Sequence, residues 1–276
     1  MNFFKHKKEE ENIINPDEQK VNQLLEMIKN HYGTRKFEVK NKDFSHFTKD
    51  DLFFTLAHFN GNNINENNAN WDSPVGFLLQ NNQTENLNFT KEDILFLLKK
   101  CNINLTHGNG VSIASLLVQN NTNQNIHLNT DEMIYFLEKA DLSIVNTNNE
   151  SVFGTILGNN QTLHIPKEMI DKWAVKAVRQ TDKSQPIGKD ILNYLSDNEQ
   201  LIAPELATLI IQNQQNLSSY QKQQYESNYQ EIFKKIEKIY PNRILDVQKE
   251  KTEKQVKSCL NGYRGNVIKD STPQIK

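Results

Sequence analysis

One segment recurs at intervals of about forty residues, and this recurrence constrains the fold more than any single motif. The clearest copies are FTKDDLFFTLAHFN (47–60), FTKEDILFLLKKCN (89–102) and LNTDEMIYFLEKAD (128–141). A fourth copy is IPKEMIDKWAVKA (165–177), and a looser fifth is IAPELATLIIQNQ (202–214). Units of this length are short supersecondary elements that bury their apolar faces by stacking on neighbouring units.

Each of the three clearest copies begins with the sequence pattern of a capped amphipathic helix. An apolar residue precedes a Thr or Asn, and an acidic residue follows three positions later, which is the spacing of a capping box. The pairs are Thr48 with Asp51, Thr90 with Asp93, and Asn129 with Glu132. Apolar residues then follow at helical spacing: Leu52 and Leu56; Ile94, Leu97 and Leu98; Met133, Phe136 and Leu137. The pattern predicts a helix with one buried face in every copy.

A second, shorter helix is predicted between each copy and the next. Its four versions are SPVGFLL from Ser73, VSIASLL from Val111, SVFGTIL from Ser151 and QPIGKDIL from Gln185. A small residue recurs within them: Gly76, Ala114, Gly154 and Gly188. Because glycine inside a helix costs about 1 kcal/mol relative to alanine, we expect these positions to make room for an adjacent helix. The alternative is a backbone left open to a ligand.

The paired helices and the links between copies resemble the ankyrin repeat. The links read NIN (63–65), NIN (102–104) and DLS (141–143), and Ser73, Pro74 and Val75 resemble the first three positions of the Thr-Pro-Leu-His motif. The histidine of that motif and the glycine before the link are missing, and the helix connection is about six residues longer than a period of about 33 allows. This is similar to the longer ankyrin-like repeats of intracellular bacteria. The resemblance implies an all-α, ankyrin-like helical-repeat solenoid.

Helices are also predicted on both sides of the repeats. We assign residues 17–46 to an N-terminal capping helix and its link, 47–217 to the ankyrin-like repeats, and 218–260 to C-terminal capping helices interrupted at Pro241. Residues 1–16 and 261–276 are expected to be flexible.

Composition excludes several classes of function. The net charge is −2, with both signs mixed along most of the chain, so general attraction to nucleic acid or to anionic membranes is not expected. The C-terminal end from Lys234 is more basic. The N-terminus lacks the apolar core of a signal peptide, and no run has the length of a membrane span. Cys101 and Cys259 lack the spacing of a zinc site. We therefore expect a cytoplasmic protein.

Candidate catalytic residues have simpler structural interpretations. His58, His127 and His164 flank predicted helices, and His107 lies in a Gly/Asn-rich turn. Cys101 occupies the position of Ala140 in the next copy, which favours a small buried residue over a nucleophile. Acid pairs recur at helix starts, where they interact with the helix dipole. Phosphate-binding, dinucleotide-binding, HExxH and GxSxG motifs are missing. We predict no enzymatic activity, no cofactor and no metal.

The resemblance implies that partners bind at the turn tips and the first helices of the units. By position this set comprises Trp71, His107 and Asn148 at the turns, and Phe77, Ser115, Thr155 and Lys189 on the first helices. Phe77 is equally well interpreted as a core residue.

The predicted function is a non-enzymatic scaffold for protein–protein interaction. The degenerate repeats and the bias of the sequence toward Asn and Lys also suggest a bacterial effector. Such an effector would enter a host cell without an N-terminal signal peptide and bind a host protein. One alternative is a toxin or modifying enzyme whose site lies in the C-terminal region and whose repeats target it. Another is a helical solenoid that binds nucleic acid, which the near-neutral charge disfavours.

Overall fold

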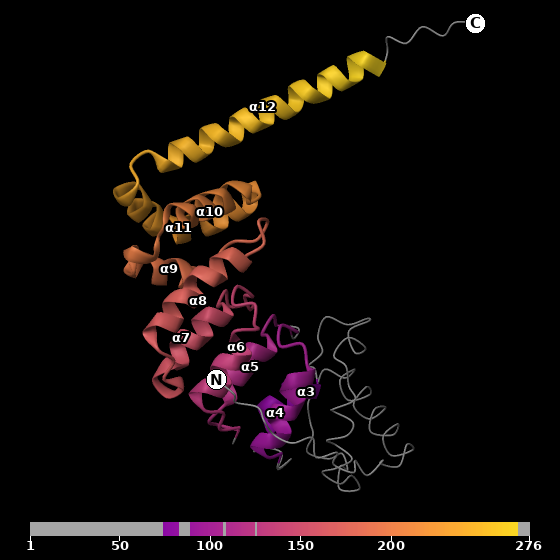
Figure 1. The fold of residues 1–276 in the computed structure, drawn as a ribbon, viewed down its shortest axis with the longest axis vertical. Helices are drawn as coiled ribbons and strands as arrows, with labels where there is room; N and C mark the ends of the chain where they lie inside the picture. Colours follow the sequence, from indigo (N-terminus) through magenta and orange to yellow (C-terminus); the bar gives the residue numbers. More distant parts are fainter. Residues whose placement is uncertain (1–73, 83–88, 107–108, 125, 270–276) are drawn as a thin grey trace, which may run out of the picture. The chain divides into compact units, whose positions relative to one another are not determined.

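A computed structural model describes residues 74–82, 89–106, 109–124 and 126–269 (Figure 1). Within these ranges the secondary structure is helical, without a β-strand, so the predicted all-α class is confirmed. The copy at 47–60 and the predicted N-terminal capping helix lie outside the described residues.

The four copies that the structure describes form four helices, of which the first two begin at the predicted capping boxes. They are α4 (Lys91–Lys100), α6 (Thr130–Leu137), α8 (Lys167–Gln180) and α10 (Pro204–Asn216). The Asp93 N–H donates to Thr90 Oγ1 at 3.3 Å, and the Thr90 N–H donates to Asp93 Oδ2 at 2.8 Å. Asn129 and Glu132 form the same reciprocal pair, at 3.0 and 2.8 Å. These bonds satisfy backbone N–H groups that have no partner within the helix.

The helices α4, α6 and α8 bury equivalent positions of the recurring segment. All nine are at most 3% exposed: Ile94, Met133 and Ile170; Leu97, Phe136 and Trp173; Leu98, Leu137 and Ala174. The predicted apolar faces of α4 and α6 are therefore buried, as helical spacing requires.

A helix precedes each of these, as predicted: α3 (Pro74–Asn81), α5 (Ile113–Asn120), α7 (Val152–Leu163) and α9 (Lys189–Asp197). Each is shorter than the helix that follows it except α5, which has the same length as α6. Ser112 and Ser151 stand directly before α5 and α7, and each Oγ accepts the N–H three residues later, from Ser115 at 3.2 Å and from Gly154 at 3.0 Å. The shared cap makes Ser115, rather than Ala114, the equivalent of Gly154. Gly188 differs from the prediction, because it lies just outside a helix as the N-cap of α9.

Close packing explains the glycine at position 154. A Cβ there would lie 1.7 Å from Asp190 Oδ2 and 3.0 Å from Asp190 Cβ. This carboxylate accepts hydrogen bonds from Ser151 N–H at 2.9 Å and from Ser151 Oγ at 2.7 Å. Gly154 thus makes room for a residue of α9 that binds the N-terminus of α7, which agrees with the expectation of space for an adjacent helix.

An asparagine at intervals of 39 residues closes the loop between the two helices of a copy. Asn82 Oδ1 accepts the Phe89 N–H at 2.9 Å, and its Nδ2 donates to the Phe89 carbonyl at 3.1 Å. Asn121 makes the same two bonds with Leu128, at 2.8 and 2.9 Å. Asn160 makes them with Ile165, at 2.8 and 3.1 Å. We call this two-bond contact the asparagine bridge.

The chain forms two compact units, and the second contains Gly110–Val118 and the chain from Asn129 onward. In this unit α7 packs on α8 and α9, and α8 packs on α9 and α10. The helix α11 (Ser219–Ile239) packs on α9 and α10, and α12 (Arg243–Lys269) packs on α10 and α11. Each of these helices therefore contacts neighbours that are close in sequence.

The end of the chain differs from the prediction in one respect. The helix α11 ends at Ile239, just before Pro241, as expected. The helix α12 continues to Lys269, nine residues past the predicted end at Leu260. The sequence contains no proline between Pro241 and Pro273 to stop it, and two internal glycines do not end a helix by themselves.

Candidate functional site

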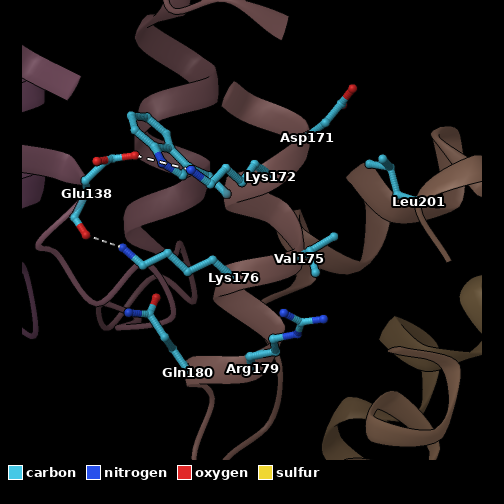
Figure 2. A pocket seen from close by; sticks show the side chains of 9 residues that line it. Glu138, Asp171, Lys172, Val175, Lys176, Arg179, Gln180 and Leu201 are labelled. Carbon is cyan, nitrogen blue, oxygen red and sulfur yellow. Dashed lines mark hydrogen bonds and ion pairs between the residues drawn. The ribbon is translucent and has the colours of Figure 1, made fainter. Parts of the chain in front are cut away.

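Three cationic side chains lie along one side of α8 and line a cavity of about 510 Å³ (Figure 2). Lys172, Lys176 and Arg179 are spaced four and three residues apart, which places them on one face of a helix. We call this surface the α8 basic face. Glu138, beyond the end of α6, and Leu201, in the short 3₁₀ helix η3 (Glu199–Leu201), complete its borders.

The two lysines of this face are held by the C-terminal end of α6. Lys176 Nζ donates to the carbonyl oxygens of Glu138 at 2.6 Å and of Ala140 at 3.0 Å. Lys172 Nζ lies 3.5 Å from Glu138 Oε1, and both side chains are largely exposed. Figure 2 shows the contacts of Lys172 and Lys176 with Glu138 as dashed lines. The cations interact favourably with the negative end of the α6 dipole. Burial lowers the pKa of Lys176, although attraction to Glu138 opposes the change.

Arg179 is the cation of this face that remains open to a ligand. Its side chain is exposed and forms no hydrogen bond or ion pair with the part of the chain that the structure describes. A guanidinium presents a planar set of donors that matches a carboxylate or phosphate. Asp171, by contrast, accepts from Lys167 Nζ at 2.7 Å and from Tyr194 OH at 2.6 Å. The arrangement is therefore suited to binding an anionic group.

The structure describes four of the seven predicted partner-binding side chains. Trp71, His107 and the side chain of Phe77 lie outside the described residues. Asn148 and Lys189 are exposed, on a turn and at the first residue of α9. Ser115 and Thr155 are only 5% and 1% exposed.

The burial of Ser115 and Thr155 has a local cause. Ser115 occupies the small-residue position of its helix, where it is the equivalent of Gly154, and its N–H is bound by the Ser112 cap. The Thr155 hydroxyl donates to the Ser151 carbonyl at 3.2 Å, one turn earlier in the helix. Because neither side chain reaches the surface, we omit both from the surface proposed below.

Asn148 lies at the tip of a turn that other side chains shape. Asn146 Oδ1 accepts the N–H groups of Asn148 at 2.9 Å and Glu150 at 3.1 Å, and Val145 pairs with Ser151 across the turn. Asn149 adopts a left-handed conformation with φ of 61°. This geometry holds the Asn148 side chain in solvent without engaging it, so it remains free to contact a partner.

The other chemical candidates have structural roles in the described region. His127 and His164 are exposed and left-handed, with φ of 52° and 54°, directly before Leu128 and Ile165 of the asparagine bridges. Burial raises the pKa of the Cys101 thiol to about 12, so it stays protonated at neutral pH. The described residues contain no cluster of three or more His, Cys, Asp or Glu placed to hold a metal. None of the described helices has both the length and the apolar character to cross a membrane.

The predictions from sequence did not identify the α8 basic face. Its signal was present, since KWAVKAVR places Lys172, Lys176 and Arg179 on one helical stripe. Lys176 has the equivalents Lys100 and Lys139, but Lys172 and Arg179 have no cationic equivalent in these copies, so recurrence does not reveal the stripe.

The chain matches no protein-family model, and comparisons with curated proteins and with solved structures also find no match.

Proposed function

We propose that the protein is a non-enzymatic scaffold for protein–protein interaction, built as a solenoid of ankyrin-like units with capping helices. Its partner binds on the exposed face of the units, with the α8 basic face as a principal contact. The composition and the long repeats support an effector of an intracellular bacterium that binds a host protein.

The observation that carries this proposal is a contrast between buried and exposed positions. At Leu97, Phe136 and Trp173 the equivalent residues are apolar and buried. One position earlier, the equivalent residues are Phe96, Tyr135 and Lys172, which differ in chemistry and are all exposed. A common buried frame with varied exposed residues is typical of repeat proteins that bind partners through their surface.

The packing of the second unit supports the same interpretation. Its helices contact neighbours along the chain, as in a linear stack. A Cβ at Gly110 would lie 3.0 Å from Asn146 Cα, so the turns of two successive copies lie against each other. Turns in register present an extended row of side chains to a partner.

Affinity capture tests the proposal. The full chain is immobilised as wild type, as the double variant Lys172→Glu and Arg179→Glu, and as the control Lys249→Glu, and the proteins retained from a host-cell lysate are quantified by mass spectrometry. Lys249 is an exposed lysine of α12 that does not line the α8 basic face. We expect the double variant to retain its partner at least roughly fivefold less than the other two, because charge reversal replaces attraction with repulsion.

Retention that is equal for all three proteins would contradict a role for the α8 basic face. Retention of no protein by the wild type would contradict the scaffold function itself. Thermal unfolding of the three proteins confirms that they are equally folded.

A further inference from the structure

A second groove, with a volume of about 400 Å³, is lined by residues of α8, α10 and α12, and α12 packs on α10. The helices meet through buried Val247 of α12, and Lys251 Nζ donates to the Gln215 carbonyl at 3.0 Å and to Asn216 Oδ1 at 3.0 Å. Lys251 thereby satisfies the C-terminal end of α10. We call this cavity the α10 groove.

The charges that line the α10 groove are predominantly positive. Four cations, Arg179, Lys183, Lys251 and Lys254, face one carboxylate, Glu250. Arg179, Lys183 and Lys254 are exposed and form no hydrogen bond or ion pair within the described residues. A concave surface with charges of one sign attracts ligands of the opposite sign.

The floor of the groove contains an unused amide. Both the nitrogen and the oxygen of the Gln215 side chain are buried and have no hydrogen-bond partner in the described part of the protein. Leaving such groups unpaired is costly, and a bound ligand with both a donor and an acceptor removes the cost. The peptide backbone carries one donor and one acceptor in each residue.

We propose that the α10 groove binds an extended acidic peptide segment of a partner protein. Carboxylates of the segment bind Arg179, Lys183 and Lys254, and its backbone pairs with the amide of Gln215. The inference rests on the proposed function, because it assigns a partner chemistry to a protein-binding scaffold.

Single-stranded nucleic acid is the main competing anion, and the lining of the groove disfavours it. Sites for single strands combine cations with aromatic side chains on which bases stack. The residues that line the α10 groove include no aromatic side chain, and the neutral ones are mainly amides and the aliphatic Val178, Leu209 and Val247.

Fluorescence anisotropy on the full chain tests the proposal with three labelled probes. They are a ten-residue peptide in which Glu alternates with Ser, the same peptide with Gln in place of Glu, and a single-stranded oligonucleotide of ten nucleotides. The protein variants are Lys254→Glu, Gln215→Leu, and Lys257→Glu as the control. Lys257 lies on the same helix, is equally exposed and does not line the groove.

We expect the acidic peptide to bind more tightly than the other probes, and Lys254→Glu to weaken it roughly fivefold. Gln215→Leu weakens it without lowering the midpoint of thermal unfolding, while Lys257→Glu changes the affinity less than twofold. Preference for the oligonucleotide, equal binding of the two peptides, or equal loss in Lys254→Glu and Lys257→Glu overturns the proposal.

The capture experiment separates this inference from the proposed function. Because Arg179 lines both cavities, the separation uses Lys172→Glu alone: a partner whose retention falls in this variant, together with no preference for the acidic peptide, overturns the inference alone. Retention of no partner overturns the proposed function.

Discussion

At the scale of single residues, the asparagine bridge and Asp190, for which Gly154 makes room, provide hydrogen-bond partners for backbone groups that have none in a regular helix or strand. Asn121 occupies both backbone groups of Leu128, which is buried and has no neighbouring strand to bind. Buried N–H and C=O groups need partners, so each bridge offsets a desolvation cost. Asp190 serves α7 in a similar way, through two bonds from Ser151.

Substitution of Asn121 by Ala is expected to lower the free energy of unfolding by about 2–3 kcal/mol, because both backbone groups of Leu128 lose their partner. Asn123→Ala is the matched control, since this exposed asparagine lies two residues away and its side chain forms no hydrogen bond within the described residues. Urea denaturation measures both. Equal effects of the two substitutions would contradict the role of the bridge.

Two glycines of α7 are expected to respond oppositely to alanine. Gly154→Ala forces Asp190 away and destabilises the protein by about 1–3 kcal/mol. Gly158→Ala meets no atom within 4 Å and stabilises it by about 0.5–1 kcal/mol through helix propensity. Thermal denaturation gives both values. A Gly154→Ala protein as stable as the wild type would show that α9 does not constrain this position.

At the scale of helices, buried and partly buried polar contacts link α11 with α10, with η3 and with the residue two positions before α9. The Tyr229 hydroxyl donates to Asn213 Oδ1 and accepts the Ile187 N–H at 2.9 Å. Glu199 in η3 accepts from Lys235 at 2.7 Å and from Lys238 at 3.3 Å, both on α11. These contacts specify which helices pack together, whereas apolar burial favours packing without specifying the partner.

Tyr229→Phe is expected to cost about 1–3 kcal/mol of unfolding free energy, because it leaves the buried Ile187 N–H and Asn213 Oδ1 without their partner. Tyr220→Phe provides the control, since Tyr220 is 74% exposed, and should change stability by less than about 0.5 kcal/mol. Chemical denaturation distinguishes the two. A Tyr229→Phe cost no larger than that of the control would rule out the polar link.

The contact between Glu199 and α11 is expected to depend on pH. The hydrogen bond from Lys235 lowers the pKa of Glu199 below its ordinary value of 4.5. Because the pKa is lower in the folded state, the stabilisation is fully present above the unfolded pKa and is lost as the pH falls through the folded pKa. Thermal midpoints of wild type and Glu199→Gln should differ at pH 6, and the difference should shrink as the pH falls below 4.5. A constant difference across this range would contradict the assignment.

The sequence predicted helices better than it predicted contacts between them. The capping boxes at Thr90 and Asn129 involve residues three positions apart, so the sequence alone locates them. The equivalence of Ser115 with Gly154 required the observed Ser112 cap, because an alignment by small residues alone favoured Ala114. The asparagine bridge was missed because the chain is rich in asparagine, and composition hides which of them recur for a physical reason.

At the scale of the whole molecule, we assign different roles to recurring and non-recurring residues. Recurring residues such as Asn121 and Asn160 are bound within the chain and maintain the fold. Cations without equivalents in other copies, such as Lys172 and Arg179, are exposed and are available to a partner. Recurrence in a single chain can indicate the first group, although the bridging asparagines were not predicted, whereas the position of an unrepeated side chain depends on tertiary packing.

Lysine acetylation with and without the captured partner tests this division of roles most directly. Lys172 and Lys257 are both exposed, and mass spectrometry measures the rate at which each is modified. If the partner binds at the α8 basic face, we expect it to slow acetylation of Lys172 and to leave that of Lys257 unchanged. An unchanged rate at Lys172 in the complex would contradict binding at the α8 basic face.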